Sequence, residues 1–370
     1  MKFTCEKNAL VSAVSVASRT VAQKSTIPAL EGIYIRAGVK LTLSGYNLET
    51  GITISVDAEI QQTGACIMPS RLFFDIIRKL PDETVSISVD EKFKVSIRGG
   101  ISSFTITAMS SEDYPELPEV ESDKGISLPQ NELKAMIGGT SFAVSENQAR
   151  PIHTGCLFEV EDTSITVVAV DGYRLALRRW KSEEPIGRTL KFVVPAAALK
   201  EAEKILGDTD DPCTFFLGSK HILFTIGEAT LVCRLLEGEF LDWRRVLPQN
   251  QPVKLAVNVA KMTDSIERVG LIISEKLKSP VRCKFGENTA DFRSVSTIGE
   301  AHDVCQIAGD GQDMEIGFNC RYLLDALRAI PDAECSLELI NGLSPIVMNP
   351  CDGSERYSYM VLPVRLKAGE

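Results

Sequence analysis

The sequence predicts an α+β protein made of three tandem copies of one unit, each with two helices packed on a β-sheet. Three observations support this prediction: the chain length, one helical segment that occurs three times, and strand-like runs at matching positions. At 370 residues the chain is long enough for about two to three domains of ordinary size, each with its own core.

The repeated segment reads "PSRLFFDIIRKL", "PAAALKEAEKIL" and "NCRYLLDALRAI". The copies begin at Pro69, Pro195 and Asn319, 126 and 124 residues apart. Apolar or small residues stand at offsets 4, 7 and 11 of each copy, the spacing of one helix face. They are Phe73, Ile76 and Leu80, then Leu199, Ala202 and Leu206, then Leu323, Ala326 and Ile330. The residues that follow and predict the helix ends are Pro81, Gly207 and Pro331.

Other elements recur at similar intervals. Each repeated unit is expected to begin with another amphipathic helix, which precedes the segment above. These helices lie around Leu10 and Val14, Leu133 and Ile137, and Met262 and Ile266. The strand-like runs "GIYIRA", "GCLFEV" and "VRCKF" follow these helices. Proline-punctuated linkers containing Tyr114 and Phe240 precede the first two boundaries. We therefore expect domains at 1–122, 123–249 and 250–370.

Composition is typical of a globular protein, with 44% hydrophobic and 24% charged residues. No apolar stretch approaches the roughly 20 residues that a membrane span needs, and "CEKN" interrupts the start where an export signal would be apolar. We expect a soluble, cytoplasmic protein. The ten cysteines form no C-x-x-C pair and lie mostly in apolar runs, which predicts buried, reduced thiols.

The net charge of −10 argues against a typical nucleic-acid binder, but a local basic surface is compatible with it. Offset 9 of the repeated helix lies opposite the apolar face and is basic in all three copies, at Arg78, Lys204 and Arg328. Offset 2 adds Arg71 and Arg321. Lysine and arginine also favour the last turn of any helix, so a surface facing phosphates and ordinary helix composition are both open interpretations.

The sequence lacks the usual signs of catalysis. Its three histidines, His153, His221 and His302, are isolated and have no metal-binding spacing. There is no phosphate-binding glycine loop, dinucleotide motif or nucleophile elbow. We therefore expect no enzymatic activity, no metal and no cofactor. A three-repeat hydrolase or small-ligand enzyme with dispersed acidic catalysts remains the alternative.

Six motifs, in order, resemble the bacterial DNA polymerase III beta subunit family, the sliding clamps, from "MKFT" to "LPVRL". They are "IPAL" (27–30), "PSRLFFDIIRKLP" (69–81), "VAVDGYRLAL" (168–177), "FLDWRRVLP" (240–248), "EIGFNCRYLLDAL" (315–327) and "YMVLPVRL" (359–366). The resemblance implies three clamp domains per chain and a head-to-tail dimeric ring around duplex DNA. It also implies a non-catalytic processivity factor. Because a ring holds DNA by encircling it, a weakly basic lining is enough and the exterior can be acidic.

By position, the family's DNA-contacting residues fall on Lys24, Arg71, Arg78 and Asn147, to which the repeat pattern adds Lys204 and Arg328. The family's protomer interface falls on Phe104 of one protomer and on Leu271 and Ile272 of the other. For "GLIIS", the run that contains Leu271 and Ile272, burial in an ordinary core is the alternative.

The family's partner pocket lies between the second and third domains and takes a short peptide with an apolar or aromatic anchor. Carried over, its residues are His153, Val170, Gly172, Tyr173, Arg174, Leu175, Leu241, Arg245, Val246, Met360, Val361, Leu362, Pro363, Val364, Arg365 and Leu366. Asn319, Tyr322 and Pro345 are expected to form a second subsite. The alternative is that these runs are core strands, in which alternate residues face opposite sides. His153, Leu241 and Trp243 depart from the family pattern, which affects the expected peptide preference.

The resemblance implies the following partners: duplex DNA bound without sequence preference, the replicative polymerase, a clamp-loader ATPase, translesion polymerases and mismatch-repair proteins. A specialised paralogue, for example one insensitive to a clamp-binding inhibitor, fits the same sequence. The last four residues, Lys367 to Glu370, are expected to hang free in solvent or partly to cover the pocket.

Overall fold

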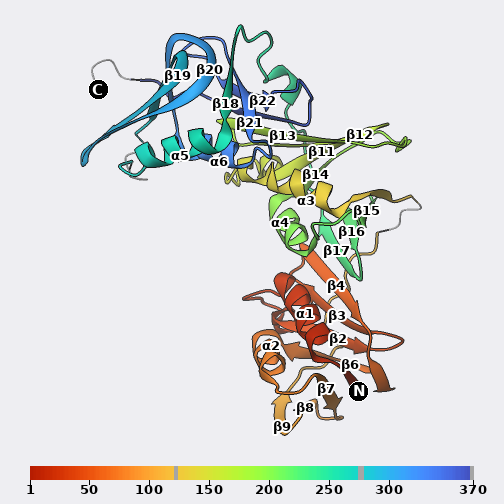
Figure 1. Cartoon of the computed structure of the whole chain (residues 1–370). Helices are drawn as coiled ribbons and strands as arrows, with labels where there is room; N and C mark the ends of the chain where they lie inside the picture. Colours follow the sequence, from red (N-terminus) through yellow and green to blue (C-terminus); the bar gives the residue numbers. More distant parts are fainter. Residues whose placement is uncertain (121–123, 274–278, 367–370) are drawn as a thin grey trace. The chain divides into compact units, whose positions relative to one another are not determined.

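The computed structural model describes residues 1–120, 124–273 and 279–366 (Figure 1). It contains two compact units, and every described strand of a given sheet lies within one unit. The first unit consists of Met1–Lys134 and Ala197–Leu235, and the second of Ala135–Ala196 and Leu236–Glu370. The second repeat is thus shared between the two units.

The first unit holds two antiparallel sheets. Across the five-stranded sheet the order is β5 (Glu59–Gln62), β1 (Lys2–Glu6), β7 (Thr84–Val89), β8 (Lys94–Gly99) and β9 (Ser102–Thr107). Across the eight-stranded sheet it is β10 (Ile126–Pro129), β15 (Pro212–Leu217), β16 (His221–Ile226), β17 (Ala229–Arg234), β4 (Thr50–Val56), β3 (Leu41–Tyr46), β2 (Gly32–Ala37) and β6 (Gly64–Pro69).

The second unit holds one ten-stranded sheet. Its order is β14 (Leu190–Pro195), β11 (Gly155–Glu161), β12 (Ser164–Val170), β13 (Arg174–Lys181), β23 (Tyr357–Val361), β22 (Ile346–Pro350), β21 (Glu334–Leu339), β18 (Val253–Asn258), β20 (Gly299–Phe318) and β19 (Val281–Ser296). Five consecutive residue pairs join β13 to β23, from Arg174 opposite Val361 to Arg178 opposite Tyr357. This ladder connects the second repeat to the third.

The six α-helices of the described residues confirm the repeat. They are α1 (Lys7–Ala17), α2 (Ser70–Lys79), α3 (Gln130–Gly138), α4 (Ala196–Ile205), α5 (Val259–Gly270) and α6 (Cys320–Arg328). The nine residues predicted at offsets 4, 7 and 11 are all buried. Short 3₁₀ turns complete the chain: η1 (Ser18–Thr20), η2 (Pro28–Glu31), η3 (Ser141–Ala143), η4 (Pro151–Thr154) and η5 (Trp243–Arg245).

The predicted strand runs also form strands, as β2, β11 and the start of β19. The sheets, however, do not follow the repeats one to one, because β4 pairs with β17 and β13 pairs with β23 across the repeat boundaries. Pairing satisfies the backbone groups that an edge strand would otherwise leave open. The fold is therefore three repeats joined by continuous sheets.

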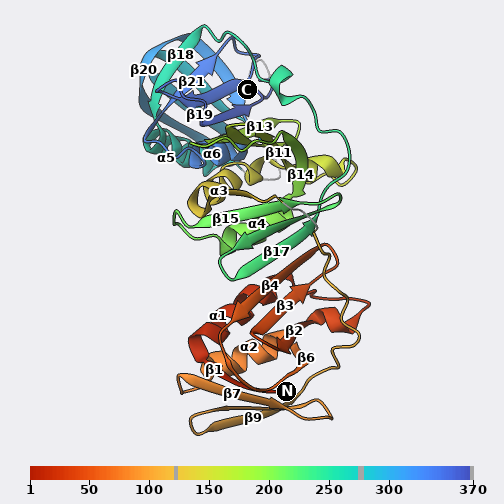
Figure 2. The same cartoon turned by 90° about the vertical axis from the view of Figure 1, so that its right-hand side faces the viewer.

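In the first repeat the core is closed by helices and both sheets together. Figure 2 shows α1 and α2 side by side against these strands. Phe73 of α2 and Leu10 of α1 are fully buried in the same cluster as Phe3, Ile35 and Val95. This packing agrees with the predicted amphipathic faces.

The two predicted linker aromatics are packed rather than loose. Tyr114 stacks on Tyr34, with ring centroids 5.0 Å apart, and its hydroxyl donates to the carbonyl of Ser44 at 3.4 Å. Phe240 is 4% exposed, in the core of the second unit. Each aromatic holds the segment that contains it against one of the two units.

All ten cysteines lie among the described residues, and none forms a disulfide. Eight are buried, as predicted, while Cys320 is half-buried and Cys351 is exposed. Burial raises the pKa of Cys5 and of Cys66 to about 12, so these thiols are protonated and unreactive at neutral pH. Separately, the helices of the described residues include none that is long and apolar enough to cross a membrane.

Candidate peptide-binding site

An apolar cluster, here called the wall cluster, covers one face of the ten-stranded sheet where β13 meets β23. Its buried members are Leu157, Val168, Val170, Leu175, Leu177, Val193, Phe240, Trp243, Val347 and Met360, and its half-buried members are Ile152, Leu236, Leu241, Leu247 and Leu362. The opposite face carries the helices, since the hydroxyl of Tyr359 on β23 donates to the carbonyl of Ala329 beside α6. Met360, the next residue, therefore faces away from α6.

Five residues predicted for the pocket meet in this cluster: Val170, Leu175, Leu241, Met360 and Leu362. Sequence reasoning missed Leu177, Leu247 and Val347. Leu177 stands two positions after Leu175 on the same strand, so strand alternation was a signal that could have found it. Val347 comes from β22, and only the pairing of β22 with β23 places it here.

His153 and the segment after Leu241 form the rim of the wall cluster. The His153 ring lies edge-on to Phe240, with centroids 5.0 Å apart, and its Nδ1 is buried without a hydrogen-bond partner. Burial and the nearby Arg150 lower the pKa of His153, so the ring is neutral at pH 7. Val246 is exposed, and Arg245 reaches into solvent with Asp242 3.0 Å away.

The turn between β12 and β13 presents Tyr173. Oδ1 of Asp171 accepts hydrogen bonds from the backbone N–H of Tyr173 at 2.9 Å and of Arg174 at 3.1 Å. Gly172 has φ +91°, a backbone conformation that disfavours other residues. Tyr173 is 62% exposed, and its ring centroid lies 6.2 Å from that of Tyr322 on α6. The turn thus holds an aromatic side chain at the surface.

Arg174 was predicted to line the pocket, but it lies on the helix face of the sheet, opposite the wall cluster. Its Nη1 donates to Asp325 at 2.7 Å, its Nε to Asp171 at 2.8 Å, and its Nη2 to the carbonyl of Phe142 at 2.6 Å. The guanidinium also lies 4.3 Å from the ring centroid of Tyr322. Through these contacts Arg174 holds the turn and Tyr322 in place, and its expected part in a peptide pocket stays a prediction. Val361, its partner across the ladder, is fully buried.

The second expected subsite surrounds the start of α6. Oδ1 of Asn319 accepts a hydrogen bond from the backbone N–H of Tyr322 at 3.3 Å, which caps the helix. Tyr322 is half-buried between Tyr173 and the Arg174 guanidinium. Pro345 is half-buried and precedes β22. Asn319 therefore caps α6 next to Tyr322, and Tyr173 is the exposed side chain beside these residues.

Backbone hydrogen bonds at Leu362 and Val364 hold the segment after β23 in place. The N–H of Leu362 donates to the carbonyl of Tyr173 at 2.8 Å, and that of Val364 to the carbonyl of Gly317 at 2.8 Å. The side chain of Leu366 lies against Gly317, and a Cβ atom added at Gly317 would lie only 2.5 Å from it. Pro363 is half-buried and Arg365 is exposed. The segment thus borders the wall cluster, while Lys367 to Glu370 lie outside the described residues.

Glu159 fixes the other border of the wall cluster. Its Oε2 accepts hydrogen bonds from Nε1 of Trp243 at 3.1 Å and from Arg244 at 2.7 Å, and its Oε1 lies 3.2 Å from Nζ of Lys191. Burial opposes ionisation of this carboxyl, but the bonds from Arg244, Trp243 and Lys191 outweigh it and lower the pKa of Glu159. The carboxylate therefore locks η5 onto β11.

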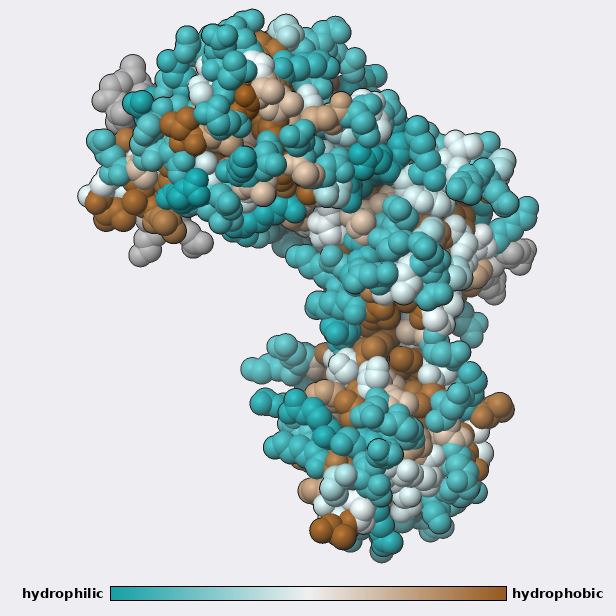
Figure 3. Space-filling view, viewed as in Figure 1, coloured by the Kyte–Doolittle hydropathy of each residue, from teal (hydrophilic) through white to brown (hydrophobic). Residues whose placement is uncertain are grey.

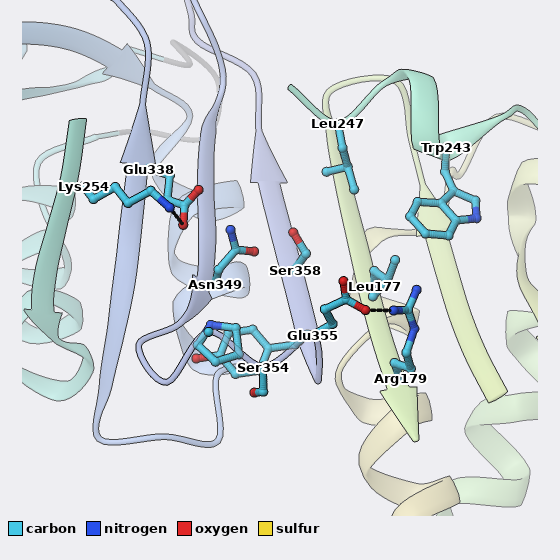
Figure 4. A pocket seen from close by; sticks show the side chains of 13 residues that line it. Leu177, Arg179, Trp243, Leu247, Lys254, Glu338, Asn349, Ser354, Glu355 and Ser358 are labelled. Carbon is cyan, nitrogen blue, oxygen red and sulfur yellow. Dashed lines mark hydrogen bonds and ion pairs between the residues drawn. The ribbon is translucent and has the colours of Figure 1, made fainter. Parts of the chain in front are cut away.

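A cavity of about 390 Å³, here called the side cavity, lies next to the wall cluster (Figure 4). Its lining residues are Leu177, Arg179, Trp243, Leu247, Lys254, Glu338, Asn349, Pro350, Gly353, Ser354, Glu355, Tyr357 and Ser358. None of these was predicted for the pocket. Leu177, Trp243 and Leu247 belong to the wall cluster as well, so the two sites share a border.

The residues predicted to contact DNA are all exposed: Lys24, Arg71, Arg78, Asn147, Lys204 and Arg328. The three that repeat at offset 9 each face a carboxylate, which the sequence pattern did not show. These pairs are Arg78 with Asp75 at 3.4 Å, Lys204 with Glu201 at 2.7 Å, and Arg328 with Glu267 at 2.7 Å. Lys24 and Arg71 have no ion pair within the described part of the chain.

The residues predicted for the protomer interface are accessible. Phe104 lies on β9, the edge of the five-stranded sheet, and is 40% exposed. Leu271 is 81% exposed, which excludes the alternative of core burial for that side chain, and Ile272 is half-buried. Figure 3 shows apolar side chains gathered at the end of α5 and the tip of the β19–β20 hairpin, where Val295 and Ile298 are also exposed.

The described residues contain no group of three or more histidine, cysteine, aspartate or glutamate side chains that could hold a metal ion.

Comparison with known proteins accounts for nearly the whole chain. Residues 1–118, 127–242 and 244–365 match the N-terminal, central and C-terminal domains of the DNA polymerase III beta subunit. The beta sliding clamp of Staphylococcus epidermidis is 32% identical over 381 residues, and that of Staphylococcus aureus 31% over 378, each covering 99% of both chains.

Solved structures give the same result. The DNA polymerase sliding clamp from Bacillus subtilis is 30% identical, with a TM-score of 0.94 over 99% of this chain and 100% of that one. The sliding clamp from Pseudomonas aeruginosa bound to griselimycin is 28% identical, with a TM-score of 0.93 over 99% and 100%. Full-length agreement also removes the three-repeat enzyme as an alternative. The chain belongs to the DNA polymerase III beta subunit family, the beta sliding clamps, which are non-catalytic processivity subunits of DNA replication.

Proposed function

We propose that two copies of this chain close head to tail into a ring around duplex DNA, and that the ring tethers the replicative polymerase through a short peptide bound at the wall cluster. The observation that carries the proposal is the wall cluster itself, a buried apolar cluster with half-buried Leu241, Leu247 and Leu362 at its border. Apolar walls with a few fixed polar groups are typical of sites that take an aromatic or aliphatic anchor.

Two features give the site a rigid frame. Arg174 ties the β12–β13 turn to α6 on one side, and Glu159 ties η5 to β11 on the other. A preformed site loses less conformational entropy when a peptide binds. The exposed Tyr173 and Val246 are the side chains that we expect a peptide to touch first.

A tethered polymerase gains effective concentration at the DNA end without any new contact to DNA. The same pocket would serve the clamp-loader ATPase, translesion polymerases and mismatch-repair proteins in turn. The limits 1–122, 123–249 and 250–370 are our proposed domain boundaries, and the cytoplasm is the proposed location.

The proposed DNA surface is weakly basic. Arg78, Lys204 and Arg328 are already paired with carboxylates, so each gains little by exchanging that partner for a phosphate. Phosphate contacts of this kind carry no sequence information. They suit a ring that must move along DNA.

The peptide proposal is tested by titrating the protein with a fluorescent peptide that carries adjacent leucine and phenylalanine residues. Val246→Asp and Tyr173→Ala should each weaken binding at least about fivefold, because charge or truncation at the rim removes apolar contact. The matched control is Val39→Asp, an exposed valine in the first unit. Equal affinity of all four proteins would place the peptide elsewhere.

The ring is tested by sedimentation at falling protein concentration. Leu271→Ala combined with Ile272→Ala should shift the dimer to monomer at higher concentration than the parent, with only a small fall in melting temperature, because Leu271 is exposed and Ile272 is half-buried within the chain. Val304→Ala, an exposed valine on β20, is a size-matched control. A dimer that persists unchanged in the double variant would remove these two residues from the interface.

A further inference from the structure

We propose that the side cavity is an additional subsite for the same partner peptide, and that it takes a short segment carrying one basic and one acidic side chain. The inference rests on the proposed peptide function, which it extends from an apolar anchor to the residues that flank it. Four observations carry it: the volume, the border shared with the wall cluster, and the two charged pairs.

The cavity has the size and the walls of a binding site. Its volume of about 390 Å³ falls in the range of small-ligand pockets. One wall is apolar, from Leu177, Trp243 and Leu247, and the rest of the lining is largely polar or charged (Figure 4). Aliphatic stems of long charged side chains can lie on such a wall while their ends reach polar partners.

Two charges inside the cavity are fixed and of opposite sign. Arg179 is 17% exposed, and its Nε donates to the hydroxyl of Thr166 at 3.1 Å. Glu338 is 11% exposed and lies on β21, in the middle of the sheet. Because both side chains are largely shielded from solvent, each charge needs a partner of opposite sign.

The present partners of these charges are exposed. Arg179 pairs with Glu355, which is 70% exposed, and Glu338 pairs with Lys254 at 3.2 Å, whose side chain is 64% exposed. Ion pairs with such mobile ends are weak, because water competes for them and ordering a long side chain costs entropy. A ligand cation can therefore replace Lys254 at Glu338, and a ligand carboxylate can replace Glu355 at Arg179.

The spacing of the two fixed charges defines the ligand. β13 and β21 are separated by β23 and β22, which puts them roughly 14 Å apart across the sheet. The registers place Glu338 level with Leu175, so Arg179 lies four residues, about 13 Å, further along the strands. The two residues therefore start roughly 19 Å apart. An extended peptide advances about 3.3 Å per residue, so its basic and acidic residues should stand about six positions apart. A single small ion cannot satisfy both ends.

The cavity continues the wall cluster along the strands. On β13 the same face carries Leu175, then Leu177, then Arg179, at steps of about 7 Å. On β23 it carries Met360 and then Ser358. A peptide anchored beside Leu175 and Met360 therefore reaches the cavity within a few residues.

The test compares three kinds of peptide built on the leucine-phenylalanine anchor described above. One has no extension, one has an extension of about eight residues with lysine and glutamate about six positions apart, and one has the same extension with glutamine at both positions. The charged extension is made in both orders and on either side of the anchor. We expect one charged form to bind about fivefold more tightly than its glutamine counterpart, and to lose this gain at high salt.

Variants with opposite expected effects make the assignment specific. Glu338→Gln and Arg179→Gln should each abolish the gain from the charged extension, while the unextended peptide binds them as it binds the parent. Lys254→Met and Glu355→Met should instead increase that gain about twofold, because they remove the competing partner. An increase in affinity cannot come from misfolding.

The outcomes separate the two proposals. If the unextended peptide binds but every charged extension equals its glutamine control, the subsite is wrong and the anchor site stands. If the unextended peptide does not bind, the proposed function fails and the subsite fails with it. A gain that survives in both Glu338→Gln and Arg179→Gln would also overturn the subsite.

Discussion

Two regions of the molecule, the β12–β13 turn with Arg174 and helix α2 with Arg78, use the same kind of ion pair differently. Each arginine stands three positions from an aspartate, Asp171 and Asp75. Arg174 is 8% exposed and donates to three groups, whereas Arg78 is 56% exposed and has one long contact of 3.4 Å. Burial, not residue type, therefore decides whether such a pair fixes the position of the elements around it or contributes little to the structure.

The contrast extends to the proposed functions of these regions. The proposed peptide site is bordered by buried, multiply bonded charges, Arg174 and Glu159, which fix the geometry of the elements around it. The helix positions proposed to face DNA carry exposed charges with replaceable partners. Recognition of one peptide needs fixed geometry, while contact with a passing phosphate chain does not. Four predictions can break or sharpen this comparison.

The largest effect is expected for Arg174→Ala. Removing the guanidinium takes away the cation bonded to Asp171 and the nearer of the two cations at Asp325, where Arg321 remains 3.9 Å away. Tyr322 also loses its contact with the guanidinium. Breaking a buried ion pair from one side costs about 3–5 kcal/mol, so the second unit should unfold at markedly lower urea concentration. Peptide affinity should fall together with stability.

Arg78→Ala is the matched control, with an expected change in stability below about 0.5 kcal/mol because this arginine is exposed. Circular dichroism and urea titration measure both variants. If Arg174→Ala were as stable as Arg78→Ala, the distinction between the two regions would collapse.

A smaller effect is expected for Glu159→Gln. The amide keeps one acceptor but loses the charge that holds Arg244 and Lys191, at a cost of about 1–2 kcal/mol. Trp243 loses its charged acceptor, so its fluorescence should shift and peptide affinity should fall a fewfold. Glu161→Gln, which removes an exposed partner of the same Arg244, should change neither.

Glu159 also predicts a pH dependence. Its pKa lies below the ordinary value of 4.5 in the folded protein, so its stabilising contribution is complete above about pH 4.5. The contribution is lost as the pH falls through the lower, folded-state pKa. The stability advantage of the parent over Glu159→Gln should therefore be constant above about pH 4.5 and decrease as the pH falls below it, as urea midpoints at each pH would show. A constant difference would contradict the assignment.

The smallest effect is expected for the helix charges. An unpaired cation that contacts DNA phosphate contributes about 0.9 to the slope of log affinity against log salt. Because Arg78, Lys204 and Arg328 are already paired, replacing all three by glutamine should change the slope by less than about 1. Lys24→Gln with Arg71→Gln should change it more, although only two residues are altered. Duplex binding measured by anisotropy at several salt concentrations decides between them.

The elements of each repeat could be predicted because helix periodicity is local. Phe73, Leu199 and Leu323 stand at the same offset in their helices, and all three are buried. The joining of the sheets could not be predicted this way, since the pairing of β13 with β23 brings together residues far apart in the chain. The spacing of residues along the chain does not tell which edge strand of one repeat pairs with which edge strand of the next.

The same limit explains the site. Val170, Leu175 and Met360, which family resemblance assigned to one pocket, lie in one buried apolar cluster, while their role in binding stays a prediction. The side on which Arg174 lies depends on the register of β13, and Arg174 alternates with Leu175. Lys254 and Glu338 face each other across β18 and β21, so no short motif could reveal the side cavity.

The β13–β23 ladder limits how this chain can be cut into pieces. A fragment holding only residues 250–370 would leave one edge of β23 without hydrogen-bonding partners and would expose Val347 and Met360 to water. Open edges beside apolar surface favour aggregation. A well-behaved C-terminal fragment therefore has to bring β11 to β14 with it, which makes the seam between the repeats, rather than the repeat itself, the natural unit for dissection.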